Sequence, residues 1–188
     1  KDLDFHPTRQ DEIWVLNRGT GTSATSSGGS VVIFEKQNET TYKSKYKVDK
    51  SYTHFMNYSN AIAMGAMSTV PNGSGSNTGG SNIQMAISCE GTNGGDNFMG
   101  PTLWPTDTTI YCKRNQTNSL LGSHSDMLHQ SPKSAGIAHD DANIYWVTDG
   151  NAKNIVKYDF ASPHCYGCDD HSDGKIYRYS DVTFTYVS

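Results

Sequence analysis

Residues 135–160 constrain the fold more than any other part of the chain. They contain three short stretches typical of β-strands, at 136–139, 144–148 and 155–160, joined by turns of the kind that antiparallel strands need. A small sheet of this kind carries apolar side chains on both faces and cannot bury either of them alone. The segment therefore predicts that further sheets of similar design pack beside it.

The same pattern returns, in weaker form, along the rest of the chain. We predict an all-β fold, because no window shows a sustained helical period. With 188 residues, the chain is expected to form a single domain. The expected architecture is a β-propeller of antiparallel sheets, with about four blades or as part of a larger propeller. Its blades are expected near residues 1–55, 56–98, 99–132 and 133–188, with inner strands starting near residues 2, 60, 101 and 135.

A family resemblance supports this architecture. Residues 136–140, 143–150 and 155–160 resemble an NHL-type propeller repeat, and residues 3–7 together with 12–19 are similar to a second repeat. The resemblance implies an NHL-like β-propeller, a fold that usually has six blades. Four blades' worth of sequence then means a four-bladed ring, a propeller completed by another chain, or a fragment.

One enzyme of that family, the peptidyl-hydroxyglycine amidating lyase, binds zinc through a histidine that precedes the inner-strand glycine in three blades. The matching positions here hold Ala135, Ser59 or Asn60, and Gly100 followed by Pro101. The resemblance therefore comes without that enzyme's metal histidines. Motifs of other catalytic sites, such as Gly-x-Ser-x-Gly and His-Glu-x-x-His, are also absent, so we assign no catalytic residue.

The charge of the chain limits its partners. The formal net charge is -4, and the 15 basic residues are spread along the sequence without forming a stripe, so we expect no nucleic acid partner. No apolar run approaches the roughly 20 residues of a membrane span. The expected partner is a protein or a glycan, or copies of the chain itself.

Cysteines and glycosylation motifs predict an extracellular protein. Sequons occur at Asn38, Asn57, Asn72 and Asn115, close to the number expected by chance, but three of them lie in polar, turn-like segments. The four cysteines suit disulfides in an oxidising compartment. We expect neighbouring blades to bring Cys89 and Cys112 together, with isolated thiols as the alternative, and we expect Cys165 to pair with Cys168. The chain begins at Lys1 with no signal sequence, as a processed chain or a fragment would.

Histidines and aspartates gather in the last third of the chain. Imidazole with carboxylate suits zinc, manganese or iron, whereas carboxylate with backbone carbonyl suits calcium. We predict two candidate metal sets, one at Asp169, Asp170, His171 and Asp173, and one at His124, His129 and His139, the last on a channel strand. The same segments also hold His164, Asp126, Asp140 and Asp141.

Three hypotheses compete for residues 163–174. The two cysteines form a disulfide and the aspartates cap turns; or Asp169, Asp170 and Asp173 hold calcium; or two thiolates and two imidazoles bind zinc. The spacing of the aspartates lacks the usual calcium-loop pattern.

Two functions follow from these observations. The first is a secreted NHL-like propeller that acts as a binding or extracellular assembly module for protein or glycan partners. The second is a metal-dependent enzyme, a lyase or hydrolase, with a His/Asp site in the channel near His139 and calcium or zinc as cofactor. We favour the module over the enzyme.

Overall fold

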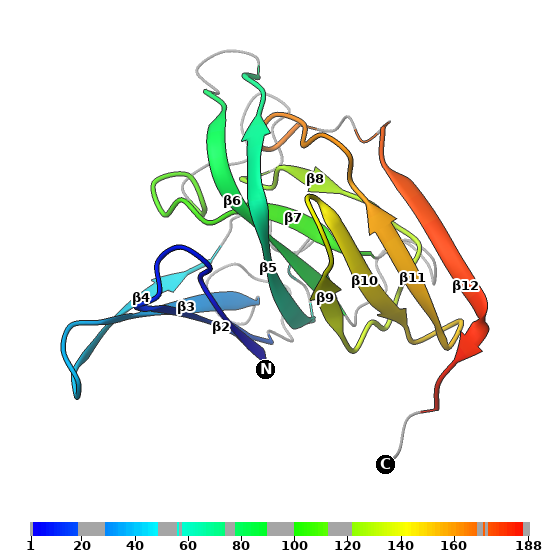
Figure 1. Ribbon diagram of the computed structural model, residues 1–188, viewed down its shortest axis with the longest axis horizontal. Coiled ribbons are helices and arrows are strands. Elements are labelled where there is room, and N and C mark those ends of the chain that lie inside the picture. Colours follow the sequence, from blue (N-terminus) through cyan, green and yellow to red (C-terminus); the bar gives the residue numbers. More distant parts are fainter. Residues whose placement is uncertain are drawn as a thin grey trace.

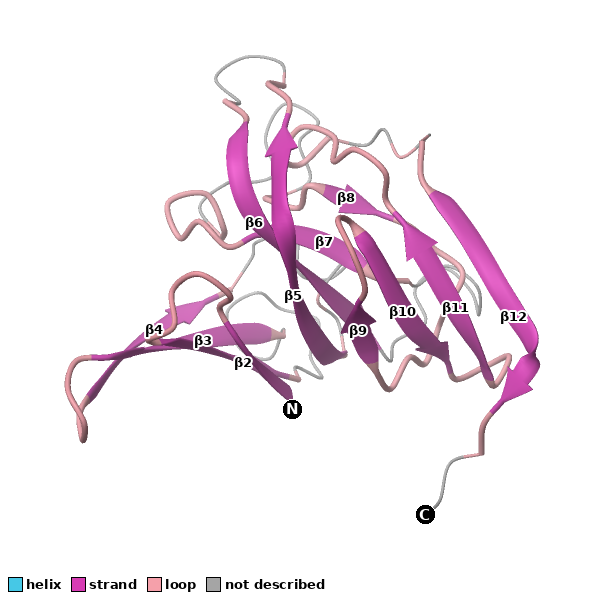
Figure 2. Ribbon diagram, viewed as in Figure 1, coloured by secondary structure: helices cyan, strands magenta, loops and turns pink. Residues whose placement is uncertain are grey.

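The computed structural model describes residues 2–18, 29–48, 56, 58–73, 78–89, 100–112, 122–168, 171 and 173–185. Within these residues the fold is all-β, with no helix and three four-stranded antiparallel sheets (Figures 1 and 2). The described part of the chain accordingly offers no helix of the length and hydrophobicity needed to cross a bilayer.

The first sheet, here called the N-terminal sheet, follows the chain order from strand to strand. Its members are β1 (Asp2–Phe5), β2 (Glu12–Asn17), β3 (Ser30–Lys36) and β4 (Tyr42–Lys47). The edge strand β4 alternates tyrosine or serine with lysine, and lysines on an exposed edge discourage pairing with other chains.

The second sheet, here called the middle sheet, also follows chain order. It contains β5 (Ser59–Val70), β6 (Gly80–Cys89), β7 (Thr102–Pro105) and β8 (Asp126–Met127). The prediction of a separate sheet at 99–132 is therefore wrong, because β7 pairs with β6 and β8 pairs with β7. Residues 102–105 had the composition of an inner strand, but they complete the sheet that β5 begins.

Residues 109–112, within the span predicted for that separate blade, form a turn. The Asp107 side chain accepts hydrogen bonds from the backbone N–H and the hydroxyl of Thr109, and the Asp107 carbonyl accepts from Ile110 and Tyr111. An aspartate that bonds to the backbone two residues ahead favours a turn over a strand. Cys112 therefore does not occupy a strand position equivalent to that of Cys89.

The third sheet, here called the C-terminal sheet, contains the segment that most constrained the prediction. Its strands are β9 (Ile137–His139), β10 (Ile144–Asp149), β11 (Asn154–Asp159) and β12 (Lys175–Thr183). The strands and turns expected across 136–160 are confirmed. A side-chain network fastens β12: Arg178 donates to Asp149 at 2.6 Å, to Asn154 at 2.8 Å and to the Gln130 carbonyl at 2.6 Å.

The three sheets pack side by side, with the middle sheet covered on both faces. On one face, Trp14, Leu16, Val31 and Ile33 of the N-terminal sheet pack against Met64, Met85, Ile87 and Trp104 of the middle sheet. On the other face, Ala63, Ala86 and Leu103 pack against Tyr145, Val147, Val156 and Tyr158 of the C-terminal sheet. Because both of its faces are covered, β6 is buried without alternation from Asn82 to Cys89, the polar side chains of Gln84 and Ser88 included.

The first strands of the three sheets are neighbours. β1 packs against β5, and β5 packs against β9. Asp2 accepts a hydrogen bond from the backbone of Ile62 at 3.0 Å, and Asp4 accepts one from Met64 at 2.7 Å. These carboxylates satisfy backbone donors that an edge strand otherwise leaves to water.

His6 links the N-terminal and middle sheets through its neutral form. Its buried ring accepts hydrogen bonds at Nδ1 from the backbone of Thr8 and Arg9, at 3.3 and 3.0 Å, and its Nε2 lies 2.9 Å from Thr106 Oγ1. Thr106 donates its own hydroxyl to Ile83, so the His6 Nε2–H is the donor to Thr106. Burial, with help from the positive charge of Arg9, lowers the pKa of His6 to about 4.

This network predicts a loss of stability at mildly acidic pH. The unfolded chain binds a proton at this histidine below a pKa near 6.5, whereas the folded chain binds it only near 4, so stability rises with pH between those values. Lowering the pH from 7.5 to 5 is expected to cost the wild type about 2 kcal/mol more than it costs His6→Gln. Urea unfolding at both pH values measures the difference, and an equal loss in both proteins would refute this role for His6.

Candidate metal centre

Three histidines meet where the middle sheet contacts the loop between β11 and β12. The ligand atoms that His124, His164 and His171 offer all lie within 4.8 Å of one another. His124 is fully buried, and the side chains of His164 and His171 are only 9 and 19 % exposed. Three imidazoles at this separation are a ligand set that zinc and similar divalent ions use in proteins.

The His124 side of the cluster is held rigidly by the middle sheet. His124 precedes β8, and its ring makes an edge contact with the ring of Trp104, with 6.1 Å between centroids. Next to it, Ser125 donates through its backbone to Leu103 and through its hydroxyl to the buried Gln84 side chain at 2.6 Å. A ligand on such a fixed segment needs little reorganisation to bind a metal.

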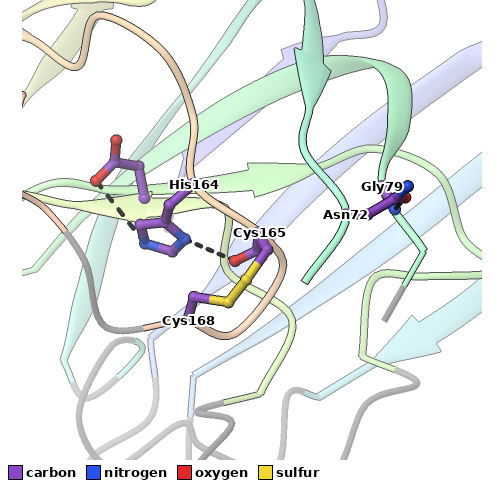
Figure 3. Close-up of a disulfide and its surroundings, with 6 residues drawn as sticks. Asn72, Gly79, His164, Cys165 and Cys168 are labelled. Atoms are coloured by element: carbon purple, nitrogen blue, oxygen red, sulfur yellow. Dashed lines mark hydrogen bonds and ion pairs between the residues drawn. A yellow bond between two sulfur atoms is a disulfide. The ribbon is translucent and has the colours of Figure 1, made fainter. Parts of the chain in front are cut away.

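The other two histidines come from the loop that leads to β12. Cys165 and Cys168 lie at disulfide distance, with 5.4 Å between their Cα atoms, and Gly167 donates its backbone N–H to the His124 carbonyl at 2.6 Å. Figure 3 shows His164 beside this disulfide, with one ring nitrogen toward the Cys165 carbonyl. Further along, Gly174 lies so close to Leu128 that an added Cβ would be 2.5 Å from a leucine methyl.

Hydrogen bonds fix which nitrogens these two imidazoles present. His164 Nδ1 lies 2.6 Å from the Cys165 carbonyl, which can only accept, so Nδ1 carries a proton and Nε2 is the nitrogen that offers a lone pair in the neutral ring. His171 Nδ1 lies 3.1 Å from Asp126 Oδ1, the arrangement by which a carboxylate orients a metal-binding histidine.

Asp126 brings a buried carboxylate to the same place. Only 1 % of it is exposed, and burial raises its pKa to about 6, against the opposing effect of the His171 hydrogen bond. Its Oδ1 accepts from the Met127 backbone and from His171, and lies 3.9 Å from His164 Nε2. Its Oδ2 is buried and has no hydrogen-bond partner among the described residues.

The predicted metal residues are only partly brought together. His124 and His171 lie in the cluster, whereas the other two predicted histidines, His129 and His139, do not join it. His139, on β9, places its Nε2 3.0 Å from the Ala142 carbonyl and its ring against Tyr145. Asp173 accepts a hydrogen bond from the Ser162 backbone, and Asp169 and Asp170 lie outside the described residues.

The cluster also contains residues that sequence reasoning did not assign. The sequence places His164 and Asp126 among the histidines and aspartates of this region, but neither belongs to a predicted metal set. The signal that favours His164 is its position beside Cys165 in a loop already selected for metal chemistry. No sequence pattern singles out Asp126, because its importance depends on burial.

The other predicted sites are placed as follows. Cys89 is fully buried in the core, where burial raises the pKa of its thiol to about 12, and Cys112 packs against the same core cluster. A disulfide between them stays a prediction. Asn38 and Asn72 are exposed, which suits glycosylation, whereas Asn57 and Asn115 lie outside the described residues.

Comparison with protein-family models, with curated proteins and with solved structures finds no match for this chain. The arrangement of its side chains therefore carries the functional argument.

Proposed function

We propose that the three sheets are blades of an NHL-like β-propeller and that the chain acts as an extracellular binding and assembly module. The observation that carries this proposal is an apolar sheet face that nothing in the described chain covers. The N-terminal sheet packs one face on the middle sheet and turns its other face to solvent.

This open face carries apolar rows that run across the strands. Strand pairing aligns Leu3 with Val15, Val15 with Val32, and Val32 with Tyr46, one row from the inner strand to the outer one. A second row begins with Phe5, and the exposed fractions of Leu3, Phe5 and Tyr46 are 51, 57 and 67 %. Apolar side chains that are exposed together across several strands are typical of an interaction site.

The far face of the C-terminal sheet is open too. Pairing aligns Trp146, Lys157 and Tyr177 there, and the Lys157 ammonium lies 5.8 Å from the Trp146 ring centroid and 5.9 Å from that of Tyr177. Tyr179 packs on Trp146 and is 38 % exposed. The N-terminal sheet thus exposes an aliphatic and aromatic face at one end of the three packed sheets. The C-terminal sheet exposes an aromatic and cationic face at the other end.

The middle sheet indicates what partner fits these faces. Each of its faces is covered by another four-stranded sheet, so the same stacking, continued outward, places the C-terminal sheet of one copy on the N-terminal sheet of another. We therefore take a second copy of the chain as the occupant of the open face. Extracellular placement is supported by the disulfide-distance pair Cys165 and Cys168, since disulfides persist in oxidising compartments.

Light scattering on the purified chain tests this function. We expect wild type to be a dimer or a larger assembly, and the exposed-face variant Phe5→Glu to be a monomer with unchanged secondary structure. Lys43→Glu, on the other face of the edge strand, is the matched control and should remain assembled. A wild type that stays monomeric at high micromolar concentration would refute self-assembly.

The alternative function, a metal-dependent lyase or hydrolase, draws its support from the histidine cluster. Catalytic zinc sites use three protein ligands, such as three imidazoles, and keep the fourth coordination position open. However, the cluster lies beside β8, the edge of the middle sheet opposite β5, and not on the inner strand β9 where we had expected a channel site. The module therefore remains the function that we favour.

A further inference from the structure

We propose that His124, His164 and His171 bind one zinc ion, with Asp126 as the residue that positions His171 and balances the charge of the ion. This site is independent of the assembly function proposed above. It joins the outer edge of the middle sheet to the loop before β12, so a bound ion would hold these two elements together.

Hydrogen bonds determine which ring nitrogen of His164 and of His171 can bind a metal. His164 uses Nδ1–H to bond the Cys165 carbonyl, so Nε2 is the ring nitrogen that a metal can use, and it lies 3.9 Å from Asp126 Oδ1. In the neutral ring Nε2 presents a lone pair, which the carboxylate oxygen repels unless a cation lies near both. His171, whose Nδ1–H is engaged by Asp126, likewise has Nε2 available for a metal.

The buried carboxylate of Asp126 favours a cation at the same place. Burying a charged group without a counter-charge is costly, and Asp126 is buried with one oxygen that no described residue bonds. In the described chain, the Asp126 side chain lies close to His164 and His171, accepts from the Met127 N–H and is repelled by the charge of Asp173, and none of these groups is a permanent cation. A divalent ion beside it supplies the missing positive charge.

The types of ligand atom in the cluster identify the ion as zinc. Neutral imidazoles with a carboxylate nearby suit zinc more than calcium or magnesium, which prefer sets of oxygen ligands. The two sulfurs of the loop lie at disulfide distance and therefore do not serve as thiolate ligands. This separates the proposed site both from a calcium site on Asp173 and from a zinc site built on cysteines.

Zinc titration of the whole chain, carrying no histidine tag, tests the proposal. After incubation with zinc and dialysis we expect one zinc per chain by elemental analysis, and less than about 0.2 in His164→Ala and His171→Ala. His129→Ala and His139→Ala are the matched controls and should keep full occupancy. Asp126→Asn should still bind zinc, but with an affinity reduced by about 10 to 100-fold.

Two further readouts separate this site from its alternatives. The double variant Cys165→Ser and Cys168→Ser should keep its zinc if imidazoles are the ligands, whereas a thiolate site would lose it. Cobalt substituted for zinc should give the visible absorption bands of a tetrahedral site in wild type and in both histidine controls. Wild type that retains less than about 0.2 zinc per chain, or zinc retained in both His164→Ala and His171→Ala, would overturn the proposal.

Discussion

Replacing Trp14 with alanine is expected to lower the free energy of unfolding by about 3 to 5 kcal/mol, the usual cost of truncating a buried tryptophan. Trp14 lies on β2, is fully buried, and packs its ring 5.8 Å from that of Tyr111 between the N-terminal and middle sheets. Its Nε1–H donates to Glu12 at 3.0 Å, so the ring is fixed by a hydrogen bond as well as by packing. Denaturant unfolding followed by circular dichroism gives the value.

Met67→Ala is the control for Trp14→Ala. It removes a large apolar side chain from the adjoining middle sheet, outside both open faces, but one that is 58 % exposed, so its expected cost is within about 0.5 kcal/mol. Similar losses in the two variants would mean that the N-terminal sheet is not packed on the middle sheet as described.

The second large effect is expected from Gly65→Ala, at the contact between the middle and C-terminal sheets. A Cβ at Gly65 would lie 2.0 Å from the hydroxyl oxygen of Tyr145 and 3.0 Å from the ring carbon that bears it. Tyr145 is fully buried, so β5 and β10 must separate or the ring must move. We expect a loss of about 2 to 3 kcal/mol in the free energy of unfolding.

Two further variants make this prediction specific. Gly136→Ala is the control, because its Cβ would find nothing closer than 3.9 Å and should change stability little. Tyr145→Phe removes the clashing oxygen, so the double variant with Gly65→Ala should recover part of the loss. Purely additive losses in the double-mutant cycle would show that the two positions do not meet.

The sequence predicted the first three strands of the C-terminal sheet well because short local turns join them. Residues 144–148 and 155–160 alternate β-branched or aromatic side chains with polar ones, and the turn between them is too short to allow another pairing. The structure confirms these strands and their order. Where alternating strands are joined by a short turn, the local sequence is enough to determine how the strands pair.

The middle sheet was harder to predict because its order depends on longer connections. Residues 102–105 have the apolar character of an inner strand, and nothing local shows that they pair with β6 rather than starting a new sheet. The turn at 109–112 depends on the Asp107 side chain, which competes with the β-forming tendency of Ile110 and Tyr111. This is why four sheets were expected where the described residues form three.

The histidine cluster was only half predictable for a related reason. His124 and His171 were selected on composition, but they are separated by more than 40 residues and meet only because the disulfide loop folds back onto β8. His139 was expected to belong with His124, yet its position on β9 directs its ring to Tyr145 instead. Which histidines converge is decided by strand order, and spacing in the sequence does not encode it.

The central claim is that the three sheets pack side by side, with the first strand of each against the next. Nuclear Overhauser effects measure both contacts directly in an isotope-labelled sample. We predict one effect between the Asp4 side chain and the Met64 amide proton, and another between the Gly65 α-protons and the Tyr145 ring. Absence of both effects, in a sample that retains the contacts within each sheet, would contradict this account.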